Sequence, residues 1–122
     1  MYELMIEDHF AAAHQLRNYK GRCEKLHGHN WKIQVSLTAE KLNEIGLAMD
    51  FTDLKKMTRD VLSTLEHSFL NDIFPFTEIN PSSEHIAKWI YETLRKKVDN
   101  ENVEVTSITV WESDTASATY YE

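Results

Sequence analysis

Three histidines have the residue type and spacing expected of a metal site. His27 and His29 flank a single glycine in the segment LHGHNW, and His14 lies upstream in the segment FAAAH. On a strand, residues two apart point to the same face, so the His27 and His29 side chains would converge. Three neutral imidazoles with an open fourth position are a ligand set of catalytic zinc, and imidazole also suits iron and other divalent metals. From these residues alone, the alternative is a group of hydrogen-bonded histidines at the edge of a core.

Two predicted strands would position these histidines. Alternating apolar and polar residues predict strands over 2–16 and 27–39. The inward positions are Tyr2, Leu4, Ile6, Phe10, Ala12 and Leu16 on the first strand, and Trp31, Ile33, Val35, Leu37 and Ala39 on the second. His14, His27 and His29 share the parity of these two series. All three imidazoles are therefore expected on inward faces at one end of the sheet.

The remaining elements predict an α+β layer architecture. In chain order they are a turn near 43–46, a short strand ending at Asp50, a helix from 52 to about 65, a loop over 66–81, a helix after 82, and strands near 104–112 and 116–121. Thr52 and Ser82 are the expected N-caps of the two helices, because their hydroxyl oxygens can accept from free backbone amides. This order favours an antiparallel sheet with both helices on one face.

Composition and charge limit the class of protein. A length of 122 residues suggests a single domain over 1–122. The net charge of −7 disfavours nucleic acid and anionic membranes as partners. The chain has one cysteine and no features of a signal peptide, and no apolar run approaches the roughly 18 residues of a membrane helix. We therefore expect a soluble cytoplasmic protein, and because so short a domain buries a modest core, we expect an oligomer.

A basic segment surrounds the single cysteine. Arg17, Lys20, Arg22 and Lys25 lie within nine residues around Cys23, in a chain that is acidic overall. Such cations favour the reactive thiolate form of a cysteine, and they could also hold phosphate groups. An exposed loop with a small buried thiol is the equally plain alternative.

Two further segments carry candidate acid–base residues. Glu66 and His67 are adjacent at the end of the first predicted helix, where a carboxylate can orient an imidazole. Glu112 ends the inward series of the strand near 104–112, where it could bind a guanidine-like edge of a ligand. A dipole-stabilised histidine and a solvated glutamate are the alternatives. His9 and His85 lack such partners and are expected on the surface.

Taken together, these residues resemble the 6-pyruvoyltetrahydropterin synthase / 6-carboxytetrahydropterin synthase family. The resemblance is carried by an ordered set of motifs: FAAAH (10–14), C-x-x-x-HGH (23–29), MDFTDLK (49–55), LEHSFLND (65–72), NPSSE (80–84) and the terminal WES…YY region. It implies a T-fold (tunnelling fold), in which subunits assemble around a barrel, commonly as a hexamer of two trimers with active sites at subunit interfaces.

The resemblance also implies roles for the candidate residues. His14, His27 and His29 would bind Zn²⁺, and Cys23 would act as general base or acid. His67 would donate a proton, coupled to the carboxylate of Glu66. Glu112 would anchor the pterin ring. The family usually has aspartate before the catalytic histidine, so Glu66 departs from the pattern by one methylene.

The spacing between Cys23 and His27 is similar to that of the bacterial 6-carboxytetrahydropterin synthases of queuosine biosynthesis. The implied reaction is a lyase reaction that takes 7,8-dihydroneopterin triphosphate to 6-carboxy-5,6,7,8-tetrahydropterin, acetaldehyde and triphosphate. Alternatives are a pyruvoyl-forming synthase, an enzyme that cleaves dihydroneopterin without loss of phosphate, and a pterin- or metal-binding oligomer without catalysis.

Overall fold

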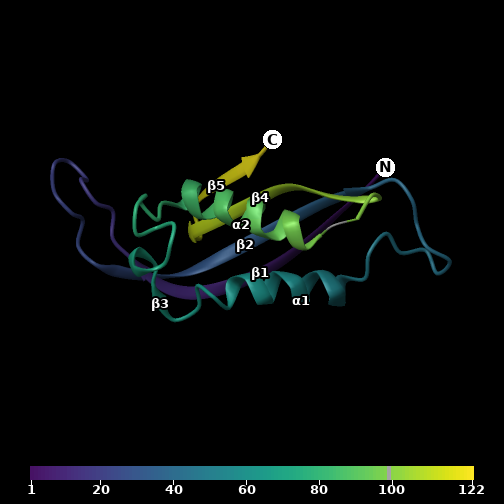
Figure 1. The fold of residues 1–122 in the computed structure, drawn as a ribbon, viewed down its shortest axis with the longest axis horizontal. Coiled ribbons are helices and arrows are strands. Elements are labelled where there is room, and N and C mark those ends of the chain that lie inside the picture. Colours follow the sequence, from purple (N-terminus) through teal and green to yellow (C-terminus); the bar gives the residue numbers. More distant parts are fainter. Residues whose placement is uncertain (99) are drawn as a thin grey trace.

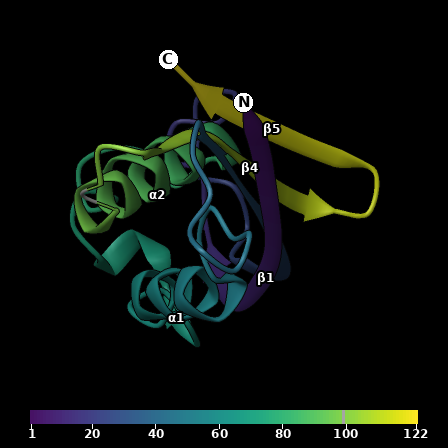
Figure 2. The ribbon, with the colours of Figure 1, turned by 90° about the vertical axis from the view of Figure 1, so that its right-hand side faces the viewer.

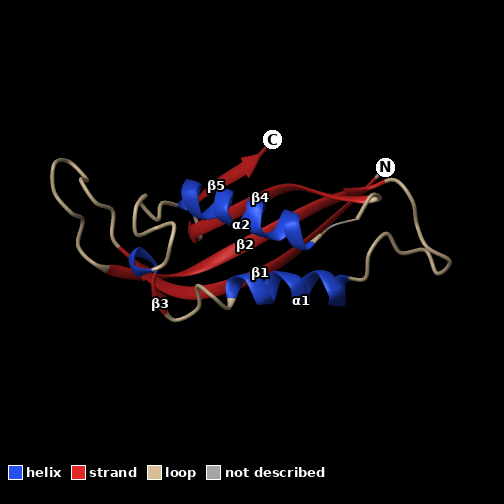
Figure 3. Cartoon of the chain, viewed as in Figure 1, coloured by secondary structure: helices blue, strands red, loops and turns tan. Residues whose placement is uncertain are grey.

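The computed structural model describes residues 1–98 and 100–122, which form one mixed sheet and two α-helices (Figure 1, Figure 3). The strands are β1 (Tyr2–His14), β2 (His27–Ala39), β3 (Ser68–Phe69), β4 (Val103–Ser113) and β5 (Ala116–Tyr121), in the order β3-β1-β2-β4-β5. The helices are α1 (Phe51–Leu62) and α2 (Ser83–Lys97), with a 3-10 turn, η1, at Leu70–Asp72. All strand pairs are antiparallel except β1 with β3, which confirms the predicted α+β class.

The core lies between one face of the sheet and both helices (Figure 2). The predicted inward residues of β2, from Trp31 to Ala39, are all buried, as are Ile6 and Phe10 of β1. β1 and β2 pair without interruption from Tyr2↔Ala39 to His14↔His27. This register brings the three histidines to one end of the face that carries the core, as their parity predicts.

Helix starts follow their capping residues. Ser82 caps α2 as predicted, because its hydroxyl accepts a hydrogen bond from the His85 amide. The predicted cap of α1 is wrong: Asp50 takes that role, its carboxylate accepting from the Thr52 amide. α1 also ends at Leu62 rather than near Leu65. Leu65 is nevertheless buried in the turn that follows, so it extends the apolar stripe without being helical.

Two strand predictions are also corrected. The short strand expected before Asp50 does not form, because the Asn43 side chain accepts from the amides of Ile45 and Leu47 and closes a turn there. β1 ends at His14 instead of residue 16. No helix in the described parts of the chain is long and apolar enough to cross a membrane.

Candidate metal centre and its surroundings

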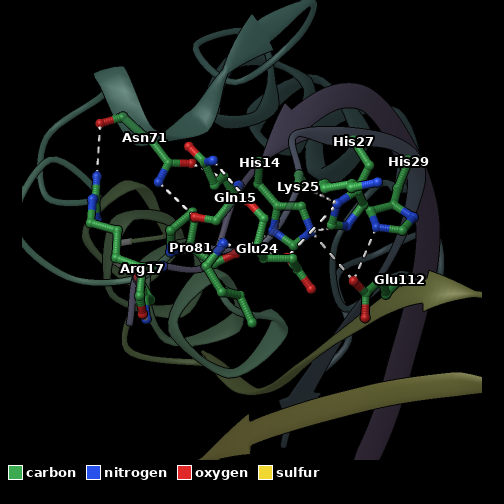
Figure 4. Close-up of polar contacts among 12 residues, drawn as sticks. His14, Gln15, Arg17, Glu24, Lys25, His27, His29, Asn71, Pro81 and Glu112 are labelled. Carbon is green, nitrogen blue, oxygen red and sulfur yellow. Dashed lines mark hydrogen bonds and ion pairs between the residues drawn. The ribbon is translucent and has the colours of Figure 1, made fainter. Parts of the chain in front are cut away.

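Four side chains converge where β1 ends and β2 begins (Figure 4). His14, His27, His29 and Glu112 each offer one ligand atom, and all four atoms lie within 4.8 Å of one another. In the antiparallel register His14 lies opposite His27, and Ala12 lies opposite His29. The predicted histidines are therefore brought together, and they are joined by a carboxylate that was expected only to bind a ligand.

Backbone carbonyls select the tautomer of two of the histidines. Nδ1 of His14 lies 2.8 Å from the Pro81 carbonyl oxygen, and Nδ1 of His27 lies 2.8 Å from that of Lys25. A carbonyl only accepts hydrogen bonds, so both Nδ1 atoms must carry the proton. In the neutral rings the lone pairs are then on Nε2, the two atoms that face the centre of the cluster.

The cluster fits a cation better than it fits hydrogen-bonded histidines. Nε2 of His14 and Nε2 of His27 lie 3.0 Å apart, and two lone pairs at that distance repel each other. The Glu112 Oε1 atom, 3.4 Å from the His14 Nε2, adds negative charge to the same space. A divalent cation between these atoms makes each interaction attractive, and imidazole with carboxylate is a ligand set used by zinc.

His29 also presents a neutral nitrogen that could bind a cation. Its Nε2 atom is buried and has no hydrogen-bond partner among the residues that the structure describes. The Glu112 Oε1 atom lies 3.0 Å from it, and that charge favours protonation. Burial prevails and lowers the pKa of His29, with smaller contributions of the same sign from His14 and His27. The ring is therefore kept neutral, which is the form that binds a metal.

Two features that the sequence did not reveal shape this centre. The Trp31 ring packs edge-on against His14 and His29, with ring centroids 4.8 and 5.0 Å away, so it separates the cluster from the core. Glu112 lies at an irregularity in the β4–β5 pairing, between Trp111 and Ser113. Such a bulge redirects a side chain, and here it accompanies a carboxylate turned toward the imidazoles.

The loop between β1 and β2 places Cys23 outside the cluster. The loop is closed at its base by the Glu24 amide, which donates to the Leu16 carbonyl at 2.9 Å. Cys23 is exposed and lines an open pocket. The other residues of this pocket are Tyr19, Lys20, Arg22, Glu24 and Lys25. Three of the four predicted cations therefore border the thiol.

Arg17, the fourth cation, faces the opposite way. Its guanidinium donates to the carbonyl oxygens of Phe76, at 2.6 Å, and of Asn71 and Ile79, both at 3.3 Å. Figure 4 shows Arg17 and Asn71 on the far side of His14 from Glu112. Arg17 thus fixes the segment that leads to α2, and it is not among the residues of the Cys23 pocket.

Two asparagines extend β1 beyond its last strand residue. The Asn71 amide group pairs with both backbone polar groups of Gln15, at 3.0 and 2.7 Å. The Asn80 amide group pairs in the same way with Arg17, at 2.8 and 3.0 Å. The contacts of Asn80 also fix the neighbouring residue Pro81, whose carbonyl oxygen accepts from Nδ1 of His14 and orients that ring. The sequence motifs LEHSFLND and NPSSE contain Asn71 and Asn80, but they did not reveal that these side chains hold the end of β1.

Histidines outside the cluster follow the prediction only in part. His9 is exposed, as expected. The expectation of a surface role for His85 is wrong, because it is half-buried and its Nδ1 donates to the Asn80 carbonyl at 2.7 Å. His85 therefore helps to hold the same segment that orients His14.

Glu66 and His67 lie in the turn between α1 and β3. His67 is exposed, with its backbone in the left-handed region at φ 54°. The Glu66 carboxylate accepts from the Ala11 amide at 2.6 Å and from Arg59 at 3.3 Å. The bond from Ala11, followed by the charges of His67 and Arg59, lowers the pKa of Glu66. Within the described ranges, neither carboxylate oxygen is hydrogen-bonded to the His67 ring.

Comparison with known proteins agrees with this arrangement. The sequence profile of the family described as 6-pyruvoyl tetrahydropterin synthase matches residues 3–122. A 6-carboxy-5,6,7,8-tetrahydropterin synthase of Synechocystis sp. is 34% identical over 127 residues, covering 99% of this chain and 94% of the relative. A dihydroneopterin monophosphate aldolase of Pyrococcus furiosus is 35% identical over 105 residues, covering 86% and 84%. The chain therefore belongs to the 6-pyruvoyl tetrahydropterin synthase family.

Solved structures show the same architecture. The 6-pyruvoyl tetrahydropterin synthase of Caenorhabditis elegans superposes with a TM-score of 0.86 at 26% sequence identity, covering 99% of this chain and 95% of that protein. This likeness confirms the predicted T-fold for the chain.

Proposed function

We propose that the protein is a zinc-dependent 6-carboxy-5,6,7,8-tetrahydropterin synthase, a lyase of queuosine biosynthesis. In this reaction 7,8-dihydroneopterin triphosphate and one water give 6-carboxytetrahydropterin, acetaldehyde and triphosphate. The observation that carries the proposal is the histidine cluster, in which two carbonyl-fixed tautomers direct lone pairs toward one point. Family membership and the Synechocystis relative support a pterin as the substrate.

In this proposal the three histidines bind the metal, and Cys23 and His67 transfer protons. His14, His27 and His29 would hold Zn²⁺, which supplies a Lewis acid for an oxygen of the substrate side chain. The Cys23 thiolate would remove a proton from a side-chain carbon. His67 would donate a proton to the ring. Glu112, whose Oε1 lies 3.4 Å from His14 Nε2 and 3.0 Å from His29 Nε2, would turn from the cluster to bind the 2-amino and N3 edge of the pterin, which would leave the three histidines as the metal ligands.

The basic pocket beside Cys23 would hold the triphosphate. Lys20, Arg22 and Lys25 bring three positive charges to a loop of an otherwise acidic protein, whose net charge is −7. Neutralising the leaving triphosphate on this side would place its ester bond near the thiol that starts the elimination. Arg17 has no part in this contact, because its guanidinium is bonded to three backbone carbonyls.

The site would be completed in a homo-oligomer, for which we propose a hexamer of two trimers. Cys23 and His67 are both exposed in the isolated chain, although a proton-transfer site benefits from exclusion of water. A neighbouring copy would cover them. We further propose that residues 1–122 act as a single domain in the cytoplasm, with a small molecule as the only ligand besides the metal and no nucleic acid or membrane partner.

Product analysis tests this function against its neighbours. The purified, zinc-loaded protein is incubated with 7,8-dihydroneopterin triphosphate, and the pterin products are identified by mass spectrometry. We expect 6-carboxytetrahydropterin together with acetaldehyde. A pyruvoyl product would assign the chain to pyruvoyl-forming synthases, and bound but unchanged substrate would leave only a binding function.

A second candidate is suggested by the Pyrococcus furiosus relative, which is named a dihydroneopterin monophosphate aldolase. An aldolase of that kind cleaves the side chain while the phosphate stays on the departing fragment. The two candidates predict different behaviour of phosphate. Release of inorganic triphosphate favours the synthase, whereas its absence, with cleavage of a monophosphate substrate, favours the aldolase.

A further inference from the structure

Arg59 of α1 connects the helix to the middle of β1 and to the turn before His67. One guanidinium nitrogen, Nη2, donates to the His9 carbonyl at 2.7 Å. The other two face carboxylates, with Nε 3.2 Å from Asp8 Oδ2 and Nη1 3.3 Å from Glu66 Oε1. Three separate segments therefore meet at one side chain.

Glu66 and His67 in turn occupy both backbone polar groups of Ala11. The Ala11 amide donates to Glu66 Oε2 at 2.6 Å, and its carbonyl accepts from the His67 amide at 2.7 Å. A side-chain carboxylate thus takes the place that a backbone carbonyl would have in a strand pair. The regular pairing of β1 with β3 begins at the next residue, Ala12.

His67 needs such an anchor because of its backbone conformation. Its φ of 54° lies in the left-handed region, which is unfavourable for a residue with a side chain. A conformation of this kind persists only where the surrounding structure fixes it. The His67 side chain is exposed and offers little packing, so its backbone is held by its own amide bond to the Ala11 carbonyl and by the contacts of its chain neighbours, Glu66 with the Ala11 amide and Ser68 with Ala12.

We propose that Glu66 and Arg59 are positioning residues for His67, and that Glu66 takes no part in proton transfer. This inference rests on the proposed function, in which His67 donates a proton to the substrate. Arg59 holds Glu66, Glu66 holds Ala11, and the resulting anchor sets the direction of the imidazole. Both oxygens of Glu66 are engaged in this way, at 2.6 and 3.3 Å. The bond from Ala11 also lowers the pKa of Glu66, so the carboxylate remains an ionised acceptor at neutral pH.

Two substitutions of Glu66 separate positioning from proton relay. Glu66→Gln keeps the length of the side chain and an oxygen that can accept from the Ala11 amide. Glu66→Asp keeps the charge but is one methylene too short to reach Ala11 and Arg59 together. Positioning therefore predicts that kcat decreases in the order wild type, Glu66→Gln, Glu66→Asp. A relay predicts that Glu66→Asp retains activity and Glu66→Gln loses it.

Arg59 has a matched control elsewhere in the chain. Arg95 of α2 is similarly exposed and also faces two carboxylates, Glu104 and Glu122, away from the turn that carries His67. We expect Arg59→Ala to lower kcat about tenfold, because small misplacements of a catalytic group cost up to about 100-fold. KM should stay within about twofold, as a displaced proton donor leaves ground-state binding intact. Arg59→Lys should recover part of the loss, and Arg95→Ala should match the wild type.

The experiment measures kcat, KM and the pH profile of kcat for the full-length, zinc-loaded oligomer with 7,8-dihydroneopterin triphosphate. It also follows hydrogen exchange at the His67 amide, which needs no turnover. We expect faster His67 exchange in Arg59→Ala and Glu66→Asp, and a pH profile of unchanged shape in Glu66→Gln. An active Glu66→Asp with an inactive Glu66→Gln overturns the inference, as does wild-type exchange in Arg59→Ala. A wild-type protein without turnover overturns the proposed function instead, while the exchange data still report whether the anchor exists.

Discussion

The histidine cluster and the loop that separates His14 from His27 are neighbours in the chain but differ in how they are held. His14 is only 2% exposed, and its Nδ1 atom donates to the Pro81 carbonyl. In the loop, Cys23 is exposed, and Asn18, Lys20 and Gly21 all have positive φ. The candidate metal ligands are therefore all supplied and held by one chain, whereas the exposed thiol would be positioned by a neighbouring copy packed over the loop.

Replacing a histidine of the cluster should have the largest effect on metal binding and activity, and it should leave the loop around Cys23 unchanged. Removal of an outer-shell partner of a metal site typically costs 10–100-fold in affinity, so we expect His27→Ala to weaken zinc binding by more than about 100-fold. Turnover should fall to background. Metal content after dialysis and a competition titration measure the loss. His9→Ala, at an exposed histidine outside the cluster, is the control, and stoichiometric zinc in His27→Ala would contradict the assignment.

Replacing the thiol should leave the metal in place. We expect Cys23→Ala to lower kcat by about 10²–10⁴-fold, the usual contribution of a positioned acid or base. Zinc content should equal that of the wild type, because Cys23 is not one of the residues of the cluster. Steady-state kinetics with parallel metal analysis distinguish the two regions directly. Full turnover by Cys23→Ala would remove the loop from the chemistry.

The cations of the loop should affect substrate binding more than the chemical step. We expect the double variant Arg22→Ala/Lys25→Ala to raise KM for the triphosphate substrate about tenfold, since each exposed ionic contact contributes up to about 1 kcal/mol. Dihydroneopterin without phosphate should bind both proteins alike. The control is Lys96→Ala/Lys97→Ala, which removes two exposed charges from the end of α2. Equal KM increases in the two double variants would point to net charge rather than to a site.

Arg17 should behave unlike the other cations of its segment. Arg17→Ala leaves the Phe76 and Asn71 carbonyls without this donor, and we expect a loss of about 1–3 kcal/mol in the free energy of unfolding. Lys20→Ala, at an exposed position in the same loop, should be nearly neutral. Denaturant unfolding of both variants measures the difference. Equal stability would mean that Arg17 is as dispensable as the cations around Cys23.

The parity of two strands was enough to predict that His14, His27 and His29 come together. Because side chains alternate strictly along a strand, the apolar series that ends in Ala39 also fixes the direction of His27 and His29. The start of α2 was predictable for a similarly local reason, since Ser82 caps it through an amide three residues away. Local rules of this kind do not depend on the rest of the chain.

Contacts between distant segments could not be predicted in this way. Asn71 pairs with Gln15, 56 residues away, and nothing in its own neighbourhood distinguishes it from a turn asparagine. The α1 cap was missed because Asp50 and Thr52 are both good caps, and only the fold decides between them. The contacts of Arg59 could not be predicted either. A basic residue in the last turn of a helix is already explained by the helix dipole, so nothing local pointed to partners in other segments.

The pairing of His14 with His27 has a consequence for how this loop can evolve. His14 and His27 lie at the two ends of the loop, and the hydrogen bond between Leu16 and Glu24 joins the two ends just inside them. Doubling the length of a flexible loop costs only about 0.6 kcal/mol of loop-closure free energy. Insertions between Asn18 and Arg22 would therefore leave the contacts at the two ends of the loop intact. Mutation would therefore exchange the reactive group on the loop while the candidate metal ligands at its two ends stay in place, so the proton-transfer group and the metal ligands would be free to change separately.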